Sequence, residues 1–277
     1  PVVYFLNTKF VHAALSNNFY GFLKASSDSH GEHVYVGTES CTDAPTQCAD
    51  NGYTNHVCVD KANANEGVEC KPRCPIPTSG DVGISNDCTM LDQVTVTGDL
   101  TVTGKENVYS KVTAASSKRH FHIASGTPTL TLRWLNLTDG APGMTQKGGS
   151  IYIEGVAASL IFSHCAFVNN RAQRGGAVWA HSTGCLASIE GSTFERNVAD
   201  YHGGALNLYS CTVTLSGNSF TLNKAIQHYG GAVYLSHGLL QNSTFYQNEA
   251  GSGGGGIYLE GYTNSPAEFN LTSVDVI

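Results

Sequence analysis

Three side chains suited to acid–base chemistry recur at equivalent places in consecutive segments of this chain. Glu154, His181 and Tyr209 each follow a pair of glycines by the same number of residues. On neighbouring coils of a solenoid they would lie about 5 Å apart, beside Trp179. Polysaccharide lyases and hydrolases move protons with such groups. These three are the catalytic candidates, but no two aspartates fall on neighbouring coils, and we expect a protein that is not an enzyme.

A second column lies two positions earlier in the same segments and is mostly aromatic. We call it the aromatic stripe; it comprises Tyr152, Trp179, Asn207, Tyr234 and Tyr258. Outward-facing aromatic rings along a rod can stack on sugar rings or pack against another subunit. Alternatively, they only stabilise the sheet through cross-strand packing. The stripe is therefore a candidate surface for binding or assembly.

A third column directly precedes the glycine pairs and is partly basic. It comprises Lys147, Arg174, His202 and Tyr229, which we call the cationic column. These side chains are either solvated turn residues or contacts for an anionic glycan or a partner's carboxylate. His202 and His228 do not fall in register, and no aspartates cluster as a calcium site requires, so we expect neither a metal nor a cofactor.

The elements that would position these columns are predicted by two repeated motifs. One is a glycine pair followed by alanine and an aliphatic residue, at Gly175–Val178, Gly203–Leu206 and Gly230–Val233. The other is F-x-x-N-x-A, beginning at Phe167, Phe194, Phe220 and Phe245. A period of about 25–28 residues is typical of a solenoid whose units stack on one another.

The residue types of the repeat favour strands over helices. Paired glycines allow a sharp corner and a close backbone approach. The strand after them alternates, so that Val178 and Ala180 point into a core shared by all coils. The phenylalanines would stack inside, and the asparagines three residues later would form a hydrogen-bonded ladder at a turn. We therefore predict an all-β chain with a right-handed parallel β-helix.

These motifs resemble the β-helix repeats of polymorphic outer membrane proteins and related adhesin passengers. The resemblance covers residues 148–258 and implies a pectin-lyase-like fold with a surface-exposed structural or adhesive role. That family is bacterial, whereas clustered glycosylation sequons and a six-cysteine segment are more typical of eukaryotic extracellular proteins. Only the fold and the structural or adhesive class are therefore carried over.

Composition excludes some partners. The chain has 277 residues and a formal net charge of −7, with no basic patch interleaved with aromatic residues, so nucleic acid is not expected as a partner. No apolar run has the length of about 18 residues that a membrane-spanning helix needs, and we expect no direct membrane span in this segment.

The nine cysteines fall into two groups. Six lie close together and indicate a module with three disulfide bonds of open connectivity rather than a zinc site: Cys41, Cys48, Cys58, Cys70, Cys74 and Cys88. In the repeats, Cys185 and Cys211 would stack on adjacent coils, either bridged or as thiols. Cys165 has no obvious cysteine partner, and we expect its thiol to be buried and to pack as a small hydrophobic side chain.

Three N-x-[ST] sequons, at Asn136, Asn242 and Asn270, predict N-glycans. Together with the cysteines they indicate an extracellular or cell-surface protein. We expect N-terminal strands or a cap over 1–40, the cysteine-rich module over 41–90, and the β-helix over 91–277, continuing beyond residue 277.

The sequence thus indicates an extracellular structural or adhesive glycoprotein that self-assembles with like subunits, as one repeating unit of a surface filament or appendage. The alternative is a protein that binds or modifies an extracellular polysaccharide along the aromatic stripe.

Overall fold

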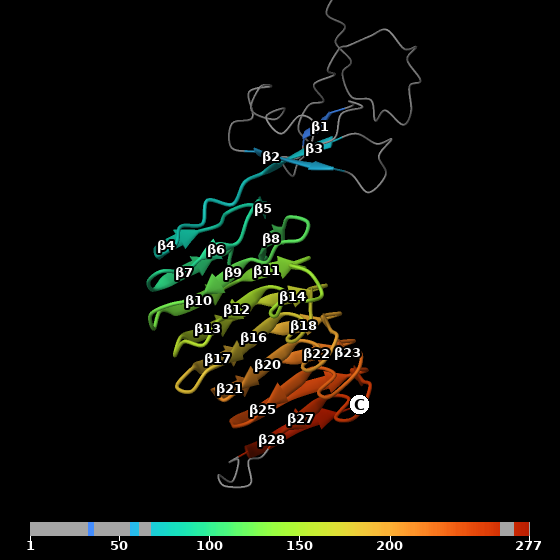
Figure 1. Cartoon of the computed structure of the whole chain (residues 1–277). Helices are drawn as coiled ribbons and strands as arrows, with labels where there is room; N and C mark the ends of the chain where they lie inside the picture. The colour runs from blue at the N-terminus through green and yellow to red at the C-terminus, as the bar shows by residue number, and fades with distance from the viewer. Residues whose placement is uncertain (1–32, 36–55, 61–67, 261–268, 277) are drawn as a thin grey trace, which may run out of the picture.

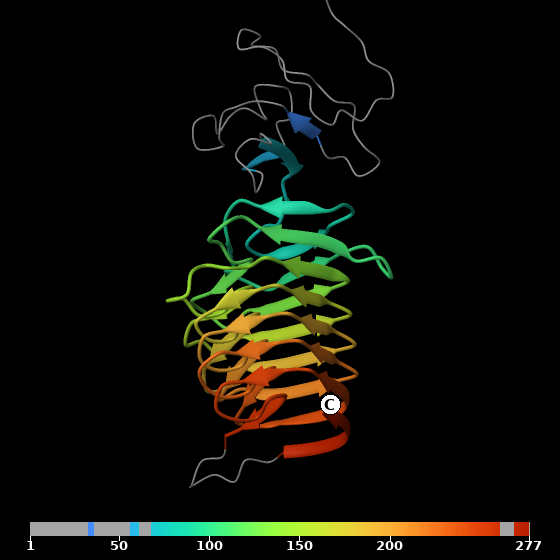
Figure 2. The same cartoon turned by 90° about the vertical axis from the view of Figure 1, so that its right-hand side faces the viewer.

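The computed structural model describes residues 33–35, 56–60, 68–260 and 269–276. From residue 80 onward the strands pair in parallel and wind as a β-helix, coil upon coil, into a rod (Figures 1 and 2). Every described element of this rod is a strand. The predicted all-β fold and parallel β-helix are confirmed.

Two faces of the rod form one continuous sheet, because β25 runs through the corner between them. Its first arm comprises β4 (Gly80–Gly83), β7 (Leu100–Thr103), β10 (Thr129–Arg133), β13 (Ser159–Ser163), β17 (Leu186–Glu190), β21 (Thr212–Ser216), β25 (Gly238–Tyr246) and β28 (Phe269–Val276). Its second arm comprises β5 (Cys88–Met90), β8 (Ser110–Ala114), β11 (Leu135–Thr138), β14 (Ala166–Val168), β18 (Thr193–Glu195) and β22 (Ser219–Thr221), which also meets β25.

The remaining sheets complete each coil. A narrow sheet comprises β15 (Arg171–Ala172), β19 (Val198–Ala199), β23 (Lys224–Ala225) and β26 (Glu249–Ala250). The third large face, sheet C, follows the glycine pairs and comprises β6 (Val94–Thr95), β9 (Phe121–Ile123), β12 (Ile151–Ile153), β16 (Val178–His181), β20 (Leu206–Tyr209), β24 (Val233–Leu235) and β27 (Ile257–Leu259). Sheet C carries the aromatic stripe, the catalytic candidates lie at or just beyond the ends of its strands, and the cationic column lies in the turns that precede the strands.

A small antiparallel sheet precedes the helix, formed by β1 (His33–Tyr35), β3 (Val68–Pro72) and β2 (His56–Asp60) in that order. The β-helix begins earlier than the sequence predicted. β4 and β5 lie before residue 91 and already pair with β7 and β8 of the next coil. The cysteine-rich segment assigned to 41–90 therefore contributes its last part to the helix, where Cys88 is a strand residue. This start was missed because the first coils lack the glycine pair and the F-x-x-N motif.

The core is an aliphatic stack with a column of phenylalanines. Rings of Phe167, Phe194, Phe220 and Phe245 lie almost parallel, with centroids 4.9, 4.8 and 4.6 Å apart. All four are at most 1% exposed, and Val178 and Ala180 of sheet C are fully buried behind them. The predicted inward column is confirmed, and its spacing equals the distance between paired parallel strands.

The asparagine ladder is also confirmed. The side-chain amide of Asn170 donates to Oδ1 of Asn197 (3.0 Å), Asn197 to Asn223 (2.9 Å) and Asn223 to Asn248 (2.9 Å). Each amide also donates to a backbone carbonyl of the preceding coil, as Asn197 does to Phe167 at 2.8 Å. Burial of these polar groups is tolerated because each side-chain amide of the ladder both donates and accepts hydrogen bonds.

One inter-coil disulfide crosses the repeats. Cys185 and Cys211 are bridged, with Cα atoms 4.7 Å apart on adjacent coils, which settles the choice left open by the sequence. Closing a loop of this length stabilises a fold by about 3.5 kcal/mol in the chain-entropy description. Of the six clustered cysteines, Cys74 and Cys88 are bridged to each other. Cys58 faces Cys70 in backbone register. Cys41 and Cys48, like residues 1–32, lie outside the described residues.

Cys165 is free and fully buried, as predicted, but it also occupies a hydrogen-bonding position. Its backbone N–H donates to the Ser192 hydroxyl (3.0 Å), and its Sγ lies 3.5 Å from the Ser163 carbonyl. Ser192 takes the same place one coil later and donates to the Glu190 carbonyl at 2.9 Å. The sulfur thus stands where another coil has a serine hydroxyl.

We predict that Cys165→Ser changes the free energy of unfolding by less than about 1 kcal/mol, because the new hydroxyl finds the Ser163 carbonyl as its acceptor. Cys165→Ala, which cannot donate, should be the less stable variant in urea unfolding. Burial raises the pKa of the Cys165 thiol to about 12, so alkylation should require unfolding. Fast alkylation of the folded chain, or a serine variant less stable than the alanine variant, would contradict this assignment.

His120 is a fully buried histidine held in one tautomer. Its Nε2–H donates to the Val112 carbonyl (3.0 Å), and its Nδ1 accepts from the Ser150 hydroxyl (3.0 Å). Burial lowers its pKa to about 4, because a charged ring would lose its hydration.

We predict that His120 makes the fold acid-sensitive. The unfolded chain binds a proton near pH 6.5 and the folded chain only near pH 4, so this stability is complete above pH 6.5 and declines as the pH falls. The loss between pH 7 and pH 5 should be about 2 kcal/mol. Urea unfolding at both pH values checks it, with His120→Gln as the matched variant that lacks the titration. An equal loss in both proteins would exclude His120 as the cause.

Candidate functional site

The aromatic stripe is a true column on the outer side of sheet C. Tyr152 pairs in register with Trp179, Trp179 with Asn207, Asn207 with Tyr234, and Tyr234 with Tyr258. Register also adds His122 one coil before Tyr152, with the two rings stacked 5.0 Å apart. His122 could not be aligned from the glycine pairs, because none precedes β9 (Phe121–Ile123). The alternation Phe121-His122-Ile123, which matches Ile151-Tyr152-Ile153, is the signal that could have found it.

The middle of the stripe is covered rather than open. Trp179 is 5% exposed, Asn207 3% and Tyr234 8%, whereas Tyr152 and Tyr258 are half-buried. Ring contacts along the column account for part of this burial, with centroids 5.2 Å apart for Tyr152 and Trp179 and 5.4 Å for Tyr234 and Tyr258. Cross-strand packing is thus present, and a ligand would meet the ends and the margins of the stripe.

The cationic column supplies much of the cover. Lys147 Nζ lies 4.3 Å from the centroid of the Trp179 ring, and the His202 ring lies 4.8 Å from Tyr234. Tyr229 stacks on Tyr258 at 4.4 Å. These residues therefore do not project into solvent as free turn side chains, but lean over the rings beside them.

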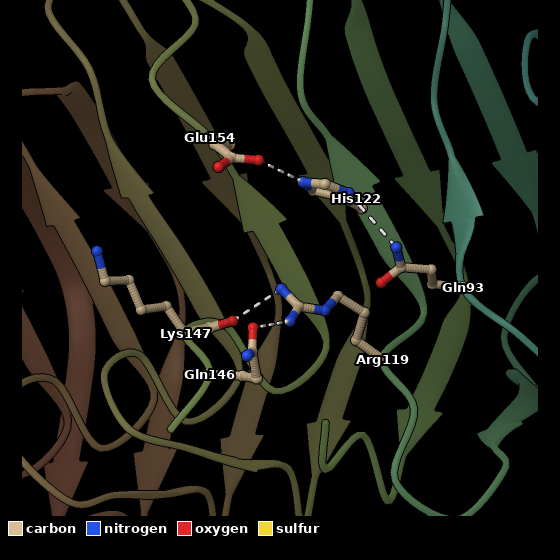
Figure 3. A network of polar contacts seen from close by, with 6 residues as sticks. All are labelled: Gln93, Arg119, His122, Gln146, Lys147 and Glu154. Carbon is tan, nitrogen blue, oxygen red and sulfur yellow. Dashed lines mark hydrogen bonds and ion pairs between the residues drawn. The ribbon is translucent and has the colours of Figure 1, made fainter. Parts of the chain in front are cut away.

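Arg119 anchors the edge of this cover. Its guanidinium donates to the Lys147 carbonyl (2.8 Å) and to the Gln146 side chain (3.5 Å), and lies 4.8 Å from the Tyr152 ring centroid. Figure 3 shows the Arg119 side chain pointing to both Gln146 and Lys147. Only 5% of Arg119 is exposed, and burial lowers its pKa. Arg119 thus fixes the loop that holds Lys147 over the stripe.

The three catalytic candidates do not form one site. Glu154 Oε2 lies 3.2 Å from Nε2 of His122, on the coil before it, rather than turning to His181. Nδ1 of His122 accepts from the Gln93 amide at 3.4 Å (Figure 3). A carboxylate can only accept here, so His122 donates from Nε2 and is oriented on both sides. The carboxylate that the sequence assigned to proton transfer is therefore paired elsewhere.

His181 and Tyr209 do meet, in register and with ring centroids 4.8 Å apart. Tyr209 also contacts Tyr234 at 5.9 Å, and His181 contacts Trp179 at 5.9 Å. Burial, and then the positive charges of Lys147 and Arg174, lower the pKa of His181. The two side chains are part of the aromatic packing around Asn207, and His181 is exposed to solvent.

A second aromatic group flanks the stripe. Tyr201 and His228 stack at 5.2 Å, and His202 stacks on His228 at 5.1 Å. Burial, with smaller contributions from Arg174 and His228, lowers the pKa of His202 to about 4, so His202 is neutral at physiological pH. The described residues contain no group of three or more metal-ligating side chains. Tyr201 was missed from sequence because it lies outside the columns aligned on glycine.

The predicted glycan sites differ in accessibility. Asn242 is exposed and has a positive φ of 49° at the corner inside β25, in line with His164, Gly191 and Gly217, which share that conformation. Asn136 is half-buried between Lys111 and Ala166 on neighbouring strands. The backbone of Asn270 lies in β28, and its side chain is outside the described residues. Asn242 therefore offers the best-presented acceptor of the two described side chains.

One family model matches the chain. It is described as the Chlamydia polymorphic membrane protein repeat, and it matches residues 242–260, which span the end of β25 and all of β26 and β27. No curated protein and no solved structure matches the chain. Across the described ranges, we find no helix with the length and apolar character of a membrane span.

The matched segment contains Phe245 and Asn248, the last members of the two internal columns. Preceding coils pair with it in register through all three sheets. The chain is a parallel β-helix repeat protein, one segment of which is similar to the repeat of Chlamydia polymorphic membrane proteins.

Proposed function

We propose that this protein is an extracellular structural or adhesive β-helix, exposed at a cell surface and not catalytic. The observation that carries the proposal is the continuity of the internal ladders. Phenylalanine rings and asparagine amides connect each coil to the next without interruption from Phe167 to Asn248. Such a solenoid is a stiff spacer that displays one face along its length.

Two further features support an extracellular location. The Cys185–Cys211 and Cys74–Cys88 bridges suit an oxidising compartment, where disulfides form and persist. The matching repeat belongs by its description to membrane proteins, which favours surface association for this chain as well. N-glycosylation, above all at Asn242, is part of the proposal.

We infer that like subunits associate into a filament or appendage. Modification of a polysaccharide is the alternative, and it ranks second because Glu154 is paired with His122 rather than with His181. Negative-stain electron microscopy of the secreted chain tests the proposal. Rods that associate into regular filaments are the expected result, together with unchanged length of any polysaccharide supplied.

Dispersed particles at all concentrations would remove the filament from the proposal. Shortening of an acidic polysaccharide by the chain, lost in Glu154→Gln with His181→Ala, would overturn the non-catalytic role. Tyr246→Ser is the control for this double variant. It changes an exposed side chain away from sheet C, in β25, and should leave any activity on the polysaccharide unchanged.

A further inference from the structure

Two cations of the cationic column, Lys147 and Arg174, have no acidic partner among the residues that the structure describes. Ion pairs in the described residues involve Lys118, Arg171, Arg196 and Lys224 among the lysines and arginines, but neither Lys147 nor Arg174. Both side chains are partly exposed, and they lie on consecutive coils, about 4.8 Å apart along the rod. In a chain of net charge −7, two adjacent cations without carboxylates are a local excess of positive charge.

The positive charge acts on the same part of sheet C. The charges of Lys147 and Arg174 both contribute, after burial, to the lowered pKa of His181. Arg174 acts in the same way on His202, one coil further. The field of the column therefore reaches both margins of the stripe, where an anion would be attracted.

Buried polar atoms without partners gather at this place. Among the described residues, five such side-chain atoms occur, and four belong to this face: Arg119 Nε, Arg174 Nε, His202 Nδ1 and Asn207 Oδ1. Asn207 is only 3% exposed. Its side-chain amide donates a long hydrogen bond of 3.5 Å to the His202 carbonyl. Each unmet group costs about 1–3 kcal/mol, so this face keeps, beside the two cations, polar groups that the fold itself does not pair.

Rings border these polar groups. Arg174 lies 5.7 Å from the Tyr201 ring centroid, and Tyr201, like Tyr152 and Tyr258, is half-buried. Cations at coil spacing next to aromatic faces suit a linear polymer that repeats both an anionic group and an apolar ring face. An acidic peptide would supply the charge but not the repeating ring face.

We propose that the face formed by Lys147, Arg174 and His202, with the rings of Tyr152 and Tyr201 at the margins of the stripe, binds an acidic polysaccharide. Carboxylate or sulfate groups pair with Lys147 and Arg174, and sugar rings pack on the half-buried tyrosines along the rod. The proposal rests on the extracellular role above and gives it a ligand class.

The test is binding of the full secreted chain to heparin, polygalacturonate and neutral dextran at low salt. We expect binding to at least one of the two acidic polymers, none to dextran, and weaker binding as salt rises. Lys147→Gln with Arg174→Gln should weaken it by about tenfold or more. Lys105→Gln with Lys111→Gln removes the same charge from exposed sites and is the matched control, expected within about twofold. Heparin against polygalacturonate distinguishes sulfate from carboxylate as the preferred group.

Equal weakening in both double variants would show that only net charge matters, and would overturn the site. So would the absence of binding to both acidic polymers. If the Lys147/Arg174 variant instead loses filaments while the wild-type chain binds no polymer, the face is a subunit interface and the proposal fails. Filaments that persist without polymer binding would leave the structural role standing and remove this site alone.

Discussion

Gly176→Ala is expected to destabilise the fold by about 4 kcal/mol or more. Gly176 is the second residue of a glycine pair, and a Cβ there would overlap the backbone carbonyl oxygen of Gly204 on the next coil. The same Cβ would lie 2.7 Å from the backbone N of Val198. Both obstacles are backbone atoms held in the inter-coil ladder, so neither can rotate away. The coils would have to separate at this corner, which weakens the stacking on both sides.

The free energy of unfolding in urea checks this, with Gly83→Ala as the matched control. Gly83 is the last residue of β4, where a Cβ meets nothing within 4 Å and φ is not positive. The control should be neutral or slightly stabilising, because alanine restricts the unfolded chain. If the Gly176→Ala protein cannot be obtained in folded form while Gly83→Ala is obtained in normal yield, the prediction is supported in the same way. Equal stability of the two variants would contradict the close coil contact.

Asn197→Ala is expected to cost about 4 kcal/mol because it interrupts the buried ladder. Oδ1 of Asn197 accepts from the backbone N–H and the side chain of Asn170, at 3.1 and 3.0 Å, and its amide donates to the Phe167 carbonyl. Removing the side chain leaves three buried groups of the preceding coil without partners. Since Asn197 is fully buried, water cannot replace these bonds without opening the corner.

Asn86→Ala is the control for the ladder, since Asn86 is exposed and its side chain bonds only to neighbouring Ser85 at 3.5 Å. It should change the free energy of unfolding by less than about 0.5 kcal/mol. Native-state hydrogen exchange adds a local measurement. In Asn197→Ala the backbone N–H of Asn170 should exchange faster with solvent. An unchanged exchange rate of this N–H would refute its hydrogen bond to Asn197.

The regular part of the fold was predictable because its residues repeat. Phe167, Phe194 and Phe220 recur with the asparagines three positions later, and stacked parallel strands turn such recurrence into columns. The glycine pairs were predictable for the same reason, since only a residue without Cβ fits where one backbone passes close to the next. The start of the helix was not, because β4 and β5 share none of these motifs.

The candidate site was predictable only as columns, not as contacts. Alignment of the repeats placed Glu154, His181 and Tyr209 side by side. The repeat period gives the position of each residue on the sheet, but it does not determine which neighbouring side chain it contacts. Glu154 turns to His122, whose position carries no repeat signature. The cover of Trp179 by Lys147 depends on the loop fixed by Arg119, and loop conformation is not encoded in the repeat period.

Peptide mapping by mass spectrometry, on protein isolated from its own source without reduction, tests the extracellular β-helix most directly. We expect a peptide pair linked through Cys185 and Cys211, an unmodified Cys165 thiol and a glycan on Asn242. The bridge reports both the stacking of adjacent coils and an oxidising compartment, and the glycan reports passage through the secretory route. Free thiols at Cys185 and Cys211 with an unmodified Asn242 would contradict the extracellular assignment.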